Sequence, residues 1–248
     1  MYVNAYFTPS AIVSNTSNEH DIYIVVDVIR ATTSMAVMFD RGAARVLAAG
    51  DIEQAREGAR RVPDRLLCGE RNVQLIPGFD HGNSPVQFSR LELSGRELIM
   101  TTTNGTRAFY ACPESAPRLA GSFYNAEAVT SYALELARMR QCDIHVVCAG
   151  ESDYFGLDDA VCAGYLVLEL QRQQPDIQLW DSTNAAIALY EAFKPPGVLD
   201  FCNAARAVVE GGLPDDPPFC MRSSVSSSVP MIVGREPETG LLVIEKAR

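Results

Sequence analysis

DIYIVVDVIRATTSMAVMFD, residues 21–40, contains the clearest strand-to-helix unit of this chain. Residues 22–28 are rich in Ile, Val and Tyr, a composition typical of a strand buried on both faces. From Thr32 the apolar spacing indicates a helix. Asp27, Arg30, Thr32 and Thr33 therefore lie between the end of a central strand and the start of a helix. Ligands bind at this position in open α/β sheets, and a helix N-terminus favours anions, so we expect an active site here.

Strands alternate with helical segments along most of the chain. The predicted strands include residues 44–49, 65–69, 96–102 and 143–148, and the predicted helices include 51–61, 126–138 and 158–171. This alternation predicts a three-layer α/β/α fold with a mostly parallel or mixed central sheet. We expect a single domain over residues 1–248. Its C-terminal part, from about residue 175, is more divergent and is predicted to contain two helices and then a β-hairpin.

The composition restricts the partners. The chain has 21 basic and 31 acidic residues, a net charge of −10, which makes nucleic acid and anionic membranes poor partners. No apolar run is long enough to span a membrane, and the N-terminus lacks the basic start of a signal peptide. The seven cysteines include no C-x-x-C pair, a pattern typical of reduced thiols. We expect a cytoplasmic protein. The sequence leaves open whether it forms a homo-oligomer.

Four segments share one pattern, in which a strand ends and polar or glycine residues precede a helix. They are residues 27–33, 68–84, 101–106 and 149–159. Because the carboxyl ends of parallel strands lie at one edge of a sheet, we expect the four segments to meet at one cleft.

The segment TTTNGT, residues 101–106, has the chemistry of an anion site. Thr103, Asn104 and Thr106 offer hydroxyl and amide groups, and Gly105 lets the backbone approach a phosphate, sulfonate or carboxylate closely. The same residues would also form a helix cap and a tight turn, and this alternative stays open.

The long loop between residues 70 and 85 concentrates polar side chains. Glu70, Asp80, Asn83 and Ser84 provide the oxygen ligands that suit Mg²⁺. A solvated surface loop is the alternative.

Asp158 and Asp159 open a predicted helix. Neighbouring helical residues point about 100° apart, so we expect only one of the two to face the cleft, and we expect it to be Asp159. Asp27 follows a buried strand, where an ionised carboxylate needs a cation or an arginine. An ion pair with Arg30 is therefore the alternative to a catalytic role for Asp27.

Five segments together resemble the Mg²⁺-dependent 2-phosphosulfolactate phosphatase family. They are VVDVIRATTS (25–34), CGERN (68–72), GFDHGNSP (78–85), TTTNGTRA (101–108) and CAG…DDAVCAG (148–164). The resemblance implies a three-layer α/β fold and hydrolysis of 2-phosphosulfolactate to sulfolactate and phosphate. The chain departs from the family at Asp158, where the family commonly has Glu, and after Pro214, where the match is loose. The loose match of the tail bears on the identity of the substrate more than on the class of reaction.

We therefore hypothesise a Mg²⁺-dependent phosphatase that acts on a small anionic phosphate monoester. The predicted metal ligands are Asp27, Glu70, Asp80 and Asp159. The predicted catalytic residues are Asp27, Arg30 and Asp159. The predicted substrate-binding residues are Thr32, Thr33, Arg71, Asn83, Ser84, Thr103, Asn104, Gly105, Thr106 and Arg107. Direct attack by water and a covalent Asp27 nucleophile both stay open. The alternative function is a non-catalytic binder of a phosphorylated or sulfonated anion.

Overall fold

The structure is a computed structural model that describes residues 1–12 and 18–247. Its strands are β1 (Tyr2–Tyr6), β2 (Ile22–Val26), β3 (Arg45–Ala48), β4 (Leu66–Arg71), β5 (Gln74–Leu75), β6 (Glu97–Thr101), β7 (Arg118–Gly121), β8 (Ile144–Cys148), β9 (Gln178–Leu179), β10 (Pro230–Arg235) and β11 (Leu242–Lys246). Its α-helices are α1 (Ala31–Asp40), α2 (Ile52–Arg61), α3 (Pro85–Phe88), α4 (Gly105–Ala111), α5 (Ala126–Arg140), α6 (Leu157–Gln173), α7 (Asp181–Ala192), α8 (Asn203–Glu210) and α9 (Asp216–Cys220). Three short 3-10 helices are η1 (Pro9–Ala11), η2 (Phe123–Asn125) and η3 (Gly197–Asp200).

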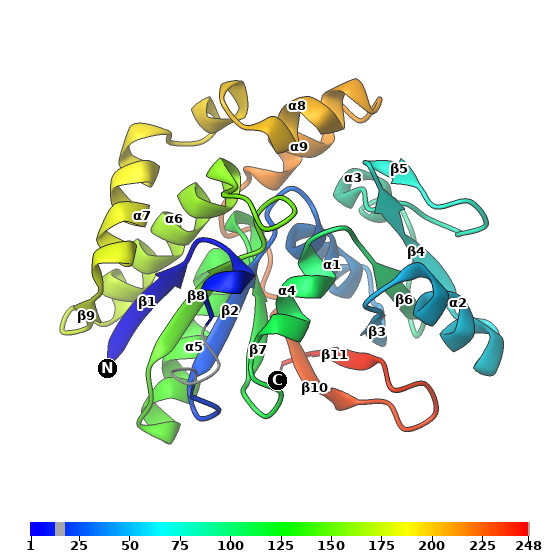
Figure 1. The fold of residues 1–248 in the computed structure, drawn as a ribbon, viewed down its shortest axis with the longest axis horizontal. Coiled ribbons are helices and arrows are strands. Elements are labelled where there is room, and N and C mark those ends of the chain that lie inside the picture. The colour runs from blue at the N-terminus through cyan, green and yellow to red at the C-terminus, as the bar shows by residue number, and fades with distance from the viewer. Residues whose placement is uncertain (13–17, 248) are drawn as a thin grey trace.

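The described strands form one mixed, mostly parallel sheet in the order β5-β4-β6-β3-β11-β10-β7-β2-β8-β1-β9. Parallel pairing joins β4, β6 and β3 in one group, and β7, β2, β8, β1 and β9 in another. The C-terminal hairpin β10–β11 lies between the groups and pairs antiparallel with β7 and β3 (Figure 1). The predicted hairpin therefore exists, and it completes the middle of the sheet.

Helices cover both faces of the sheet, which confirms the three-layer α/β fold. Every residue of β2 is buried, as its composition predicts. Because side chains alternate along a strand, Ile22 and Ile24 pack with α5 and α6 on one face, whereas Tyr23 and Val25 pack in the core of α1 on the other. A third core lies beneath α2 and includes Leu47 and Ile99. Strand β2 thus fixes the position from which α1 begins.

An ionic network ties the C-terminal hairpin to β3 and β6. The guanidinium of Arg65 donates to Glu236 at 2.7 Å and to Glu97 at 2.8 Å, and Arg45 donates to Glu97 at 2.6 Å. Arg65 lowers the pKa of Glu236, because its guanidinium hydrogen-bonds that carboxylate. The network therefore stabilises the hairpin at neutral pH, where both glutamates are ionised.

Candidate active site

A cavity of about 580 Å³ lies where the ends of β2, β4, β6 and β8 approach α6 and α8. Its lining includes Asp27, Glu70, Thr103 and Gly150, so each of the four segments predicted to meet contributes to it. In Figure 1, α8 and α9 lie at the top of the view above the middle of the sheet, and α8 supplies further lining residues. The polar segments therefore converge even though an antiparallel hairpin separates the two groups of parallel strands.

Asp27 lies directly after β2 and lines the cavity. Its Oδ1 accepts a hydrogen bond from the backbone N–H of Ala31 at 3.2 Å. Its Oδ2 lies against α4, because a Cβ added at Gly105 would come within 2.7 Å of this oxygen. Burial raises the pKa of Asp27 to about 6, and the nearby charge of Glu70 contributes in the same direction. Gly105 thus allows α4 to begin against the Asp27 carboxylate.

Asp158 and Asp159 both line the cavity, so the prediction that only one faces it is wrong. Asp159 accepts hydrogen bonds from the backbone N–H groups of Val28 at 2.8 Å and Gly150 at 3.0 Å. Within the described residues, no element outside the start of α6 donates to the carboxylate of Asp158, which is 5% exposed. Burial and then the charge of Asp27 raise the pKa of Asp158 to about 7, and burial also raises that of Asp159. Asp158 is therefore the carboxylate with more capacity for a ligand.

Glu70 lines the cavity, but both of its oxygens are engaged. One accepts from the backbone N–H of Thr103 at 2.8 Å, and the other accepts from that of Val73 at 3.0 Å. The carboxylate therefore joins the TTTNGT segment to the turn between β4 and β5. Glu70 therefore holds these two segments in position.

Three predicted substrate-binding threonines lie behind the cavity wall. The hydroxyls of Thr32, Thr33 and Thr106 donate to the backbone carbonyls of Asp27, Val28 and Thr102 at 2.9, 2.9 and 3.2 Å. Short hydroxyl side chains often bond to nearby backbone in this way. All three residues are fully buried and lie outside the cavity lining. Thr103 and Asn104 are the members of the TTTNGT segment that line it.

Asp80, Arg71 and Arg107 lie outside the cavity lining. The exposed carboxylate of Asp80 accepts from the backbone N–H of Leu67 at 2.8 Å, so pairing with β4 directs it away from the other carboxylates. Arg71 donates to the hydroxyl of Thr101 at 3.1 Å. The exposed Arg107 pairs with Asp153 at 3.0 Å. The predicted four-carboxylate cluster is therefore corrected: Asp80 does not join Asp27, Glu70 and Asp159.

Arg30 lines the cavity, and its ion pair is with Asp216 on α9. Its Nη1 lies 3.0 Å from Asp216 Oδ2, and its Nη2 donates to the carbonyl of Val73 at 3.3 Å. The hydroxyl of Ser84 donates to the other oxygen of Asp216 at 2.6 Å. Asp216 is 1% exposed, so the pair is fully buried. Sequence reasoning misses Asp216, because it stands in a proline-rich turn that carries no motif.

Asn83 also lines the cavity, and the structure leaves its side-chain oxygen without a partner among the described residues. Buried amide oxygens are usually hydrogen-bonded, so this group is available to a ligand. Its position beside Ser84 places it on the same loop that supports the Arg30–Asp216 pair.

The cavity is strongly acidic, because Arg30 is the one cationic side chain that lines it within the described part of the chain. In that part, no group of three or more Asp, Glu, His or Cys side chains is arranged to hold a metal ion. Mg²⁺ does not require such a group, because it is usually bound by one or two carboxylates together with water and substrate phosphate. Asp27 and Asp158 fit this demand, since both are buried and line the cavity, and the charge of Asp27 contributes to the raised pKa of Asp158.

A family model described as 2-phosphosulpholactate phosphatase matches residues 6–235. The chain belongs to this family. A probable 2-phosphosulfolactate phosphatase of Deinococcus radiodurans is 36% identical over 219 residues, which cover 88% of this chain and 90% of the relative. A protein of the same name from Thermus thermophilus is 36% identical over 229 residues, covering 92% and 93%. The match to the family model therefore includes the C-terminal region that carries Asp216.

We predict different consequences for stability at the two neighbouring aspartates. In metal-free protein with EDTA, Asp158→Asn should raise the free energy of unfolding by at least about 1 kcal/mol, because it removes a buried charge. A carboxylate whose pKa is raised on folding opposes folding when it ionises, so this gain should be largest above pH 7 and shrink as the pH falls toward 4.

Asp159→Asn is the matched control. An amide accepts from only one of the two backbone N–H groups, so this variant should be about 1–3 kcal/mol less stable than Asp158→Asn. Urea unfolding at several pH values measures both effects. A more stable Asp159→Asn variant would contradict the assignment of roles.

Proposed function

We propose that this chain is a phosphatase that hydrolyses 2-phosphosulfolactate to sulfolactate and phosphate. Membership of the family and the names of the relatives support this reaction. The observation that carries the proposal is the buried Asp27–Asp158 pair beside Arg30 in one cavity. A binder of anions gains nothing from buried carboxylates, whereas a hydrolase that uses a divalent cation needs them.

Mg²⁺ is the proposed cofactor, and Asp27 and Asp158 are its proposed ligands. Carboxylates repel a phosphate ester unless a cation lies between them, and Arg30 alone does not balance the acidic lining. When bound, the ion would neutralise phosphoryl charge and make a water molecule more acidic.

The residues of the chain would bind and orient the ester. Arg30 would hold anionic oxygens, with its guanidinium fixed by Asp216 and by the carbonyl of Val73. The amides of Asn83 and Asn104 would donate to the remaining acid groups, while the hydroxyl of Thr103 donates to Glu70 at 3.0 Å.

We prefer direct attack by water to a covalent intermediate on Asp27. One oxygen of Asp27 accepts from Ala31, and the other lies against the backbone at Gly105. Such a carboxylate is well placed to hold a cation and is poorly placed to approach phosphorus in line. Asp159 would keep the loop after β8 in place through its bond to Gly150.

The cytoplasm is the proposed location. All seven cysteines are buried and free, which is typical of a reducing compartment. None of the described helices has both the length and the apolar composition needed to cross a bilayer.

Release of phosphate from 2-phosphosulfolactate tests the proposal directly. We expect release with Mg²⁺, a fall of about a hundredfold or more with EDTA, and recovery when Mg²⁺ is returned in excess. Release that EDTA does not change would contradict the metal assignment. Calorimetric binding of the ester without any release would support the non-catalytic binder instead.

Asp216→Asn should mainly raise KM. The variant loses the ion pair that orients Arg30, and hydrogen bonds to charged groups are worth about 1.5–3 kcal/mol, so we expect KM to rise about tenfold or more. The matched control is Asp215→Asn, because Asp215 is exposed and neighbours Asp216. Steady-state kinetics of both variants measure the effect. Equal KM values for the two variants would contradict the role of Asp216.

A further inference from the structure

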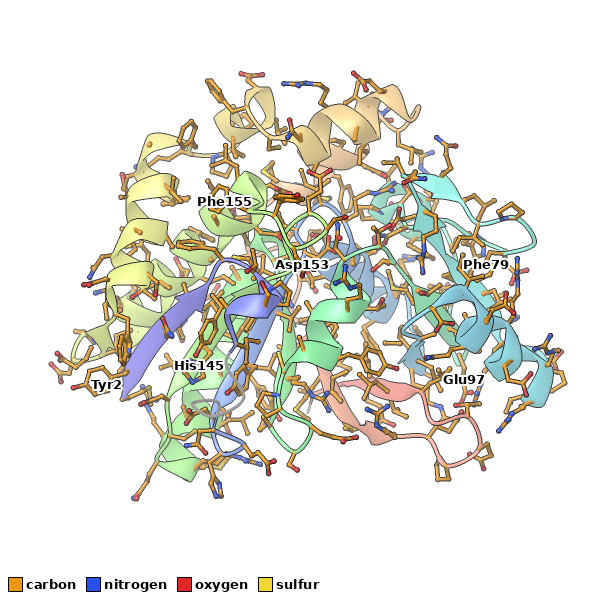
Figure 2. All side chains as sticks on the ribbon, in the orientation of Figure 1. Tyr2, Phe79, Glu97, His145, Asp153 and Phe155 are labelled. Carbon is orange, nitrogen blue, oxygen red and sulfur yellow. The ribbon has the colours of Figure 1, made fainter. Side chains whose placement is uncertain are left out.

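Part of the cavity lining is apolar. It comes from the loop before α6, from the turn after β4 and from the region of η3 and α8. We define this apolar wall by Val73, Phe155, Leu157, Phe201, Ala207 and Val208. Figure 2 labels Phe155, which lies below the chain that crosses the top of the view. Asp27, Glu70, Asp158, Asp159 and Arg30, by contrast, stand at strand ends and at the starts of α1 and α6, whereas Glu210, which also lines the cavity, is the last residue of α8.

The two aromatic rings of the apolar wall pack edge-on against Phe7 and Phe193, and about half or more of each residue stays uncovered. Phe155 is 49% exposed and Phe201 is 63% exposed. Covering apolar surface is favourable by about 25 cal/mol per Å², so a ligand that lies against these rings gains affinity. 2-Phosphosulfolactate carries a phosphate, a carboxylate and a sulfonate on three carbons, and it has no apolar group to place there. The wall therefore has no counterpart in that substrate.

The charges of the cavity also suit a ligand with fewer anionic groups than 2-phosphosulfolactate. Of the cationic side chains in the described residues, Arg30 alone lines the cavity, whereas Arg71 and Arg107 lie elsewhere. A ligand with three anionic groups would leave at least one of them without a cationic side chain. The volume of about 580 Å³ is also in the range that encloses ligands much larger than a three-carbon acid.

We propose that the cavity also accepts, and hydrolyses, phosphate monoesters of 2-hydroxy acids whose third carbon bears an apolar group of about the size of a phenyl ring. This proposal rests on the proposed phosphatase function. In the reaction, the bond between phosphorus and the ester oxygen breaks, and the oxygen of water bonds to phosphorus. One proton of that water stays on phosphate, and the other goes to the 2-hydroxyl of the released acid. The apolar group would lie against Phe155 and Phe201.

Wild-type enzyme with Mg²⁺ provides the first test, using 2-phosphosulfolactate and the 2-phosphate ester of 3-phenyllactate. We expect kcat/KM of the phenyl ester to be within about tenfold of that of the sulfonate. A value below a tenth would overturn this inference and leave the phosphatase proposal intact. If neither ester releases phosphate, the phosphatase proposal itself fails.

Phe155→Ser tests the wall, and Tyr154→Ser is its matched control. Tyr154 is the neighbouring residue, is 78% exposed and lies outside the lining. We expect Phe155→Ser to lower the ratio of kcat/KM for the phenyl ester to that for the sulfonate about fivefold or more, and Tyr154→Ser to leave it within about twofold. An equal loss for both esters in Phe155→Ser would mean that the ring only excludes water, and would overturn the inference.

Inhibition of the wild-type enzyme gives a readout that does not depend on the folding of a variant. The probes are the non-hydrolysable phosphonate analogues of the two esters. We expect the phenyl analogue to have an inhibition constant within about tenfold of that of the sulfonate analogue, and a weaker constant would overturn the inference.

Discussion

Mutual repulsion among buried carboxylates is the constraint on which the site depends. Asp27, Asp158 and Asp159 are each less than a tenth exposed and line one cavity, and burial raises the pKa of all three. Two backbone N–H groups donate to the carboxylate of Asp159, whereas among the described residues only the start of α6 donates to that of Asp158. The remaining electrostatic cost is what a bound cation would relieve, and the same relief would admit an anionic ester.

The sheet brings these groups together from distant parts of the chain. Strand β2 is buried on both faces and ends just before Asp27, while β8 leads into the loop before Asp158. The C-terminal hairpin joins the two groups of strands, and α9 places Asp216 against Arg30. The C-terminal region therefore completes both the sheet and the site, although it carries none of the five motifs.

Local patterns predict the elements and the convergence of Asp27, Arg30, Glu70, Asn83, Thr103 and Asn104 well, because strand composition and strand-end polarity report on burial. They fail where tertiary contacts decide which way a side chain points. Asp80 pairs with the backbone of Leu67, and the hydroxyl of Thr33 bonds to the carbonyl of Val28. Asp216 has no local signal, because its partner Arg30 lies far away along the chain.

Diffraction from crystals soaked in Mn²⁺, with anomalous scattering to locate the ion, tests the central claim most directly. The account predicts a single strong anomalous peak within bonding distance of the carboxylates of Asp27 and Asp158. A peak at Asp80, or a cavity without any peak at saturating Mn²⁺, would contradict it.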